Sequence, residues 1–148
     1  MNISTKGRYG LRAMVDIAVH SFGEFIPLKI IAERQDISEN YLEQVFSTLR
    51  KAKLVKSARG SQGGYTLSKD ASEITVGEVL RILEGDLGIT GDANEVSGLN
   101  KTIKVCINTI VWEKVNEQIN NAMDSVTLQD IVEKYISLNS EYTMDFII

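Results

Sequence analysis

Apolar residues recur at helical spacing over most of this chain, which predicts a mainly helical protein. A first helix is expected over 5–22, a short second helix from about Leu28, and a third helix over 39–51. Ser38 stands directly before the third helix, where its hydroxyl can accept a hydrogen bond from a first-turn amide. The buried face of the third helix consists of apolar residues at helical spacing: Tyr41, Leu42, Val45, Phe46, Leu49 and Ala52.

Two short β-like runs follow the third helix and predict a hairpin with an extended tip. They are Leu54–Ser57 and Tyr65–Leu67, joined by a glycine-rich segment, and we call residues 57–66 the wing. Helix, short helix, turn, helix and hairpin in this order indicate a winged helix-turn-helix, in which the later helix of the pair lies in a DNA major groove. Arg59 stands among small residues of the wing, which suits entry of its side chain into a narrow, strongly negative minor groove.

The second half of the chain predicts a capped helix, a loop and a long helix. Thr75 and Glu78 form a capping-box pattern at the start of a helix that ends near Glu84. Gly, Asp and Asn are frequent after it, which predicts a loop. The expected division is a winged helix-turn-helix domain over 1–84, a loop over 85–101, and a dimerisation helix with a C-terminal tail over 102–148.

The long helix, expected over 102–124, carries more apolar surface than one small core needs, so we expect it to pair with a second copy of the chain. Its stripe consists of Ile103, Ile107, Ile110, Val111, Val115 and Ile119, continued by Ala122 and Met123. A last short helix is expected to end near Ile136. Beyond it, a polar break and an apolar tail are expected, ending in Phe146, Ile147 and Ile148.

Charge divides the chain in the same way as the pattern does. The 148 residues carry a formal net charge of −4. Residues 1–70 hold 11 Lys and Arg against 7 Asp and Glu, a net of +4, whereas residues 71–148 have a net of −8. Phosphates sense a local basic patch rather than the overall charge, so the first half is the expected nucleic-acid-binding half.

Several function classes are disfavoured by composition. No apolar run approaches the ~18 residues of a membrane helix, and the N-terminus lacks a signal peptide's apolar stretch, so we expect a cytoplasmic protein without a membrane partner. The chain has one histidine, His20, and one cysteine, Cys106. Neither forms a convincing nucleophile–base pair with a neighbour, and Gly60–Gly64 is not a phosphate loop that opens a helix, so a small enzyme is a remote alternative.

Several motifs together resemble the Rrf2 family of bacterial transcription regulators. They are Ile3–Gly10, Ile37-Ser38, Tyr41–Gln44, Leu49–Lys51, Leu54-Val55, Arg59-Gly60, Gly63–Tyr65 and Ile74–Leu80. The resemblance covers nearly the whole chain except the loop over 85–101. It implies a homodimer with a winged helix-turn-helix and long crossing dimerisation helices.

The resemblance also implies which residues contact a double-stranded DNA operator. They are Arg8 and Tyr9 at the start of the first helix; Ser38, Asn40, Tyr41, Glu43, Gln44 and Arg50 on the recognition helix over 39–51; and Arg59, Ser61 and Gln62 on the wing. In physical terms Arg8 and Arg50 would clamp phosphates, Glu43 and Gln44 would read bases, and Arg59 would enter the minor groove.

Well-known family members hold an iron–sulfur cluster with three cysteines, in the loop and at the start of the long helix, and a fourth ligand. Here Cys106 matches the third cysteine position, the loop supplies no cysteine, and Thr109 stands at the place of a nearby histidine ligand. Because thiolates do most of the cluster binding, we expect no cluster and no other cofactor or metal. We expect Cys106 to be a small buried residue instead.

A cluster-free branch of the family controls cysteine and sulfur metabolism in Gram-positive bacteria and resembles this chain at its start and in its tail. Members of that branch work with cysteine synthase, which captures partners by a C-terminal isoleucine, so Ile148 could dock there or pack on the dimer. The leading hypothesis is therefore a repressor of cysteine and sulfur genes. The alternative is a cluster-free regulator of iron–sulfur assembly genes, and the recognition-helix residues do not separate the two.

Overall fold

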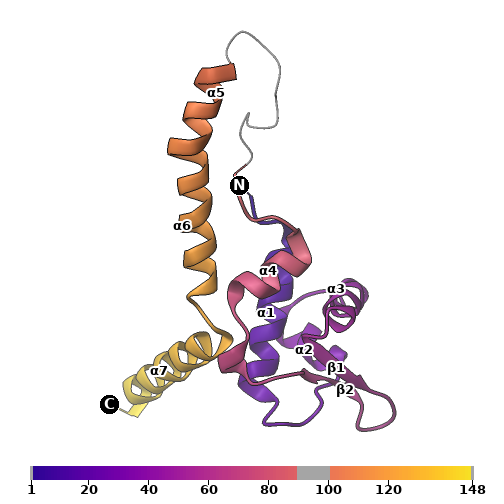
Figure 1. Ribbon diagram of the computed structural model, residues 1–148. Coiled ribbons are helices and arrows are strands. Elements are labelled where there is room, and N and C mark those ends of the chain that lie inside the picture. The colour runs from indigo at the N-terminus through magenta and orange to yellow at the C-terminus, as the bar shows by residue number, and fades with distance from the viewer. Residues whose placement is uncertain (1, 90–100, 148) are drawn as a thin grey trace.

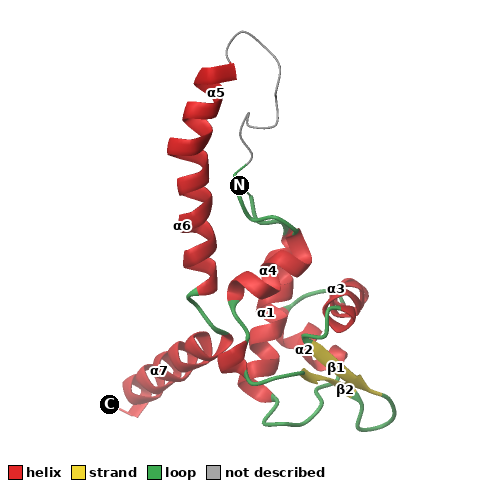
Figure 2. Ribbon diagram, viewed as in Figure 1, coloured by secondary structure: helices red, strands yellow, loops and turns green. Residues whose placement is uncertain are grey.

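The structure is a computed structural model that describes residues 2–89 and 101–147, and it consists of helices with one β-hairpin at the edge (Figures 1 and 2). The elements in chain order are α1 (Thr5–His20), α2 (Leu28–Gln35), α3 (Glu39–Lys51), β1 (Val55–Ala58), β2 (Gly64–Leu67), η1 (Ala71–Glu73), α4 (Val76–Glu84), α5 (Lys101–Ile107), η3 (Asn108–Trp112), α6 (Glu113–Asp124) and α7 (Leu128–Ile147). The expected fold class, mainly α with a small β-hairpin, is confirmed. We call residues 2–89 the head.

Helix α1 is the central element of the head, and most of the core forms around it. Its buried Met14 and Ile17 pack in one cluster with Leu42 and Phe46 of α3. Helix α4 lies close against α1 because Gly10 leaves room for it: a Cβ built there would be 2.2 Å from Leu83 Cδ1. The helices of the predicted helix-turn-helix therefore share one buried hydrophobic core.

The hairpin is antiparallel, with Val55 opposite Leu67 and Ala58 opposite Gly64. Two backbone hydrogen bonds between Ile26 and Tyr65, at 2.8 and 2.9 Å, join the hairpin to the segment between α1 and α2. Gly64 makes this approach possible, because its φ is +148° and a Cβ there would lie 2.1 Å from the Ile26 carbonyl oxygen. The wing is therefore fixed at its base to the segment that precedes α2.

An ion pair between an exposed arginine and a buried carboxylate ties α1 to the end of α2, and the sequence pattern does not predict it. The side chain of Asp16 is fully buried and accepts hydrogen bonds from Arg34 Nε at 3.0 Å and Arg34 Nη2 at 2.7 Å. It also accepts one from Gln35 Nε2 at 2.9 Å. The hydrogen bonds from Arg34 to the Asp16 carboxylate, together with its negative charge, raise the pKa of Arg34 above its ordinary value.

We expect Asp16→Asn to lower the free energy of unfolding by about 1–2 kcal/mol, because it removes the charge from a buried acceptor of three hydrogen bonds. Urea unfolding followed by circular dichroism measures the change. The matched control is Asp36→Asn at the exposed, left-handed C-cap of α2, a conformation that Asn tolerates. Equal stability of the two variants would contradict the assigned role of Asp16.

The predicted long helix is present as α5, η3 and α6, which continue one another away from the head (Figure 1). The segment η3 is a π-helical turn, which the spacing of apolar residues does not predict. At the lower end of the long helix, Ile119 and Met123 of α6 pack against Val76, Leu80 and Leu87 of the head. The upper part, from Lys101 to Val111, extends beyond these contacts.

The secondary structure predicted for the C-terminal segment is wrong. The last helix does not stop near Ile136, and the expected polar break and tail are the second half of α7, which runs to Ile147. Residues 137–147 contain no glycine or proline, and Ser and Asn disfavour a helix only mildly, so a helix that packs at its start can continue through them. Smaller differences are that α1 ends at His20 and α2 extends to Gln35.

Two of the sequence expectations fall partly on residues outside the described ranges. Of the loop expected over 85–101, residues 90–100 lie outside them, as does Ile148 of the tail. In the described part of the chain, no helix combines the length and apolarity needed to cross a membrane.

Candidate nucleic-acid interface

Helix α3 has one buried and one exposed face. Ser38 caps it by accepting a hydrogen bond from the Tyr41 amide at 3.4 Å. The buried residues recur at helical spacing and are Leu42, Val45, Phe46 and Leu49. The face left in solvent carries most of the predicted contact residues of this helix: Ser38, Asn40, Glu43, Gln44 and Arg50 are all exposed. A helix anchored on one side with polar side chains on the other can enter a major groove without losing core contacts.

The two tyrosines predicted to contact DNA have a structural role as well. Tyr9 and Tyr41 are half-buried, and their rings meet edge to face with centroids 5.9 Å apart. The Arg12 guanidinium lies over the Tyr9 ring, 5.1 Å from its centroid. These contacts join the start of α1 to the start of α3, so the two predicted contact regions form one continuous surface.

The first turn of α1 is held by a residue that the sequence pattern does not single out. Glu84, at the end of α4, accepts hydrogen bonds from the Ser4 amide at 2.9 Å and the Gly7 amide at 3.1 Å, and also from the Ser4 hydroxyl. Arg8 is exposed and donates from Nε to the Ile3 carbonyl at 3.0 Å. The carboxylate of Glu84 thereby fixes the turn from which Arg8 projects.

The wing presents the remaining predicted contacts. Arg59, Ser61 and Gln62 are exposed at the hairpin tip, where the Gly63 amide donates to the Gly60 carbonyl at 3.0 Å. Gly60 has a φ of +101°, a conformation that L side chains rarely adopt. Figure 1 shows α3 and the hairpin on the opposite side of α1 from α6 and α7.

A hollow of about 380 Å³ lies between α2, α3 and the wing. Three cationic side chains line it, those of Lys29, Arg50 and Arg59, together with one carboxylate, that of Glu39. Lys29 is not among the residues predicted from the sequence. The sequence feature that could have identified Lys29 is its position in the first turn of α2, directly after Pro27. This turn faces the start of the recognition helix.

Comparison with known proteins agrees with this arrangement. Residues 3–134 match the family Rrf2, described as an iron-dependent transcriptional regulator. The transcriptional regulator IscR of Serratia proteamaculans (strain 568) is 42% identical over 134 residues, which are 89% of this chain and 79% of that protein. The chain belongs to the Rrf2 family. It is accordingly a DNA-binding transcription regulator and not an enzyme.

Solved structures of Rrf2 regulators share the fold. The structure of CymR, the global cysteine regulator of B. subtilis, matches with a TM-score of 0.75 and 36% identity, over 90% of this chain and 98% of that one. The structure of T. potens IscR matches with a TM-score of 0.69 and 43% identity, over 91% of this chain and 88% of that one.

The predicted dimerisation stripe divides into two parts. Ile103 and Ile110 are 61% and 72% exposed, and Ile107 and Val111 are also exposed. Lower on the helix, Val115 and Ile119 are half-buried, and Ile119 packs on the head of its own chain. Within this stripe, the apolar side chains left without cover therefore lie on α5 and η3.

The residues of this Rrf2 chain do not fit the iron–sulfur cluster that the family resemblance implies. A cluster of this kind takes four ligands, mostly thiolates, and the chain has a single cysteine. That residue, Cys106, is exposed on α5, which corrects the expectation that it is buried. Among the residues that the structure describes, no three His, Cys, Asp or Glu side chains gather into a metal site.

The C-terminal residues predicted to reach a partner are not a free tail over most of their length. Phe146 and Ile147 belong to the last turn of α7. Ile148, whose carboxylate would enter a partner's site, lies outside the described residues.

Proposed function

We propose that this protein is a homodimeric regulator that reads a two-fold symmetric operator with α3 in the major groove and the wing in the minor groove. The observation that carries this proposal is the exposed surface from Arg8 across α3 to Arg59, on elements that share one buried core. Arg8, Arg50 and Lys29 bind phosphates and set the register, whereas base edges supply the specificity.

Glu43 and Gln44 are the base readers. The amide of Gln44 can pair with an adenine edge, and the Glu43 carboxylate accepts from a cytosine amino group while it repels acceptor-rich edges. Both side chains are exposed one turn into α3, beyond the capping residue Ser38. This is the part of a recognition helix that meets the bases in helix-turn-helix complexes.

A second copy of the chain covers the apolar surface of α5 and η3. Soluble monomers rarely expose a contiguous apolar patch of this kind, and four large aliphatic side chains of the stripe are exposed here. A two-fold dimer formed through this patch presents two α3 helices to one face of the duplex, in half-sites about 34–36 Å apart. Binding then blocks access of polymerase to the promoter.

We propose genes of iron–sulfur cluster assembly as the regulon. Curated relatives that are 41–42% identical over 89% of this chain carry the name IscR, the iron–sulfur regulator. This support displaces the sequence-based preference for cysteine and sulfur genes. Control is exerted without a cluster held by the chain itself, because one thiolate cannot replace a set of cluster ligands.

We expect the purified protein to remain colourless after anaerobic incubation with iron and sulfide, and to bind its operator equally before and after that treatment. Absorption spectroscopy, iron analysis and a binding titration measure the outcome, and Cys106→Ser serves as the control that removes the single thiol. A brown product with stoichiometric iron, absent from Cys106→Ser, would overturn the cluster-free proposal.

Regulation of cysteine metabolism is a second candidate, supported by the match to CymR over 98% of that chain. In this case the C-terminal Ile148 docks in cysteine synthase, and removal of Ile147 and Ile148 abolishes the complex without changing dimerisation. A map of bound genomic sites separates the two candidates.

A further inference from the structure

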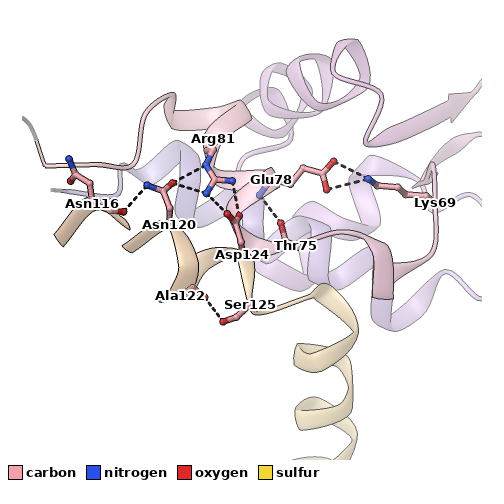
Figure 3. Close-up of polar contacts among 9 residues, drawn as sticks. All are labelled: Lys69, Thr75, Glu78, Arg81, Asn116, Asn120, Ala122, Asp124 and Ser125. Carbon is pink, nitrogen blue, oxygen red and sulfur yellow. Dashed lines mark hydrogen bonds and ion pairs between the residues drawn. The ribbon is translucent and has the colours of Figure 1, made fainter. Parts of the chain in front are cut away.

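Arg81 of α4 joins the head to α6 through a fan of hydrogen bonds (Figure 3). Its Nη1 and Nη2 donate to the two carboxylate oxygens of Asp124 at 2.7 and 2.8 Å. Nη2 and Nε also donate to Asn120 Oδ1, at 2.7 and 3.3 Å. Every nitrogen of the guanidinium therefore points at α6, in the planar, bidentate geometry that gives arginine its orientational specificity.

Two asparagines extend this contact along α6 to the start of the loop. Asn120 Nδ2 donates to the Asn116 carbonyl at 2.8 Å. The Asn116 side chain accepts from the Ile89 amide at 2.6 Å and donates to the Ile89 carbonyl at 3.1 Å. We call Arg81, Asn116, Asn120 and Asp124 the clasp. The clasp therefore contacts one face of α6 at two places, through Arg81 of α4 and through the backbone of Ile89.

The clasp restricts the orientation of α6 more than it stabilises the fold. The side chains of Arg81 and Asp124 are 35% and 46% exposed, and ion pairs open to water stabilise a fold only slightly. The apolar contact beneath it, Ile119 and Met123 against the head, holds α6 close but is non-directional. The Val76 amide donates to the Val126 carbonyl at 2.8 Å and the Leu128 amide to the Ile74 carbonyl at 2.9 Å, which fixes the chain just beyond α6. Along α6 itself, the clasp supplies the directional side-chain contacts that set its rotation and tilt on the head.

Small changes in this tilt have large consequences at the DNA. The helix from Lys101 to Asp124 is 24 residues long, which is about 36 Å at 1.5 Å per residue. A tilt of about 10° at the head moves the far end by about 6 Å, nearly twice the 3.4 Å rise of one base pair. Since the exposed dimer surface lies on α5 and η3, the same tilt shifts one recognition helix relative to the other.

We propose that Arg81 is a positioning residue that sets the separation of the two recognition helices, and hence the operator half-site spacing that the dimer accepts. The inference rests on the proposed dimeric DNA binding. It assigns a specificity-determining role to a side chain that touches no DNA. Reading of each half-site by α3 and the wing does not depend on it.

The test is in vitro selection from random duplex DNA, followed by affinity measurements on the selected sequence with half-sites moved by one base pair in each direction. The variants are Arg81→Ala and Gly77→Ala. A Cβ at Gly77 would lie 2.1 Å from Asp124 Oδ1, so Gly77→Ala displaces the partner carboxylate while alanine favours the helix. The matched control is Lys69→Ala (Figure 3). It breaks an ion pair between Lys69 and Glu78, and Glu78 lies on α4 like Arg81, but this pair does not contact α6.

We expect wild type and Lys69→Ala to prefer one spacing by at least about tenfold, and both clasp variants to accept all three spacings within about threefold. The selected half-site sequence and the dimeric mass should be the same in all four proteins. Spacing selectivity retained in Arg81→Ala and in Gly77→Ala would overturn the proposal. A wild-type selection without any two-fold symmetric sequence would instead overturn the dimeric function on which it rests.

Discussion

Ile110→Glu is expected to convert the dimer into a monomer and to weaken binding to the two-fold operator at least about 100-fold, because the second half-site is no longer tethered to the first. Ile110 is 72% exposed in the single chain, so a glutamate there leaves the fold of the monomer unchanged. In the proposed dimer the same position is covered, and an unpaired carboxylate buried in an apolar interface is strongly disfavoured.

Analytical ultracentrifugation and a titration of operator DNA measure the two effects. The matched control is Phe22→Glu, which makes the same exchange at a side chain that is 91% exposed in the turn after α1. It should sediment as the wild-type dimer. A dimer that persists in Ile110→Glu at micromolar concentration would show that α5 and η3 are not the interface.

Arg59→Ala is expected to lower operator affinity about 10- to 100-fold, which is about 1.4–2.7 kcal/mol. Arg59 is exposed at the wing tip and lines the hollow between α2, α3 and the hairpin, where it would face the DNA backbone and minor groove. The dependence of affinity on salt should weaken by about one counterion per protomer, because each arginine releases about one cation on binding.

The control for this prediction is Lys134→Ala, which removes the same charge from the exposed side of α7, away from α3 and the wing. It should bind the operator like wild type. If both variants lose affinity equally, the effect is one of overall charge and the wing does not enter the groove. Gln44→Ala should resemble Arg59→Ala in affinity but keep the salt dependence, because a base contact releases no condensed cation.

Local signals account for the parts of the fold that the sequence predicts. The recognition helix has the predicted bounds, Glu39–Lys51, because a capping serine precedes four apolar residues at helical spacing. The hairpin follows from a glycine-rich tip between short apolar runs. The Thr75 hydroxyl accepts from the Glu78 amide as predicted, although the Glu78 carboxylate binds Lys69.

Contacts between distant segments account for what the sequence does not predict. Glu84 holds Ser4 across 80 residues, and Arg81 meets Asp124 across 43. Such pairs leave no periodic or local trace in a single sequence. The continuation of α7 to Ile147 is a different case, since weak polar helix formers resemble a break in the sequence pattern although no glycine or proline ends the helix there.

Family resemblance predicts the candidate contact residues, but not how they pack. It names side chains by position, and the exposure of Asn40, Glu43 and Gln44 is compatible with that role. It does not reveal that Tyr9 and Tyr41 pack on each other, or that Lys29 lines the same hollow as Arg50 and Arg59. These features depend on how α1 and α2 are placed against α3.

Genome-wide mapping of bound sites, for wild type and for Arg59→Ala expressed at the same level, tests the central claim most directly. We predict two-fold symmetric sites upstream of iron–sulfur cluster assembly genes, with occupancy lost in Arg59→Ala. Sites confined to cysteine and sulfur genes would contradict the proposed regulon in favour of the second candidate. Sites that Arg59→Ala occupies as fully as wild type would contradict the assigned DNA-binding surface.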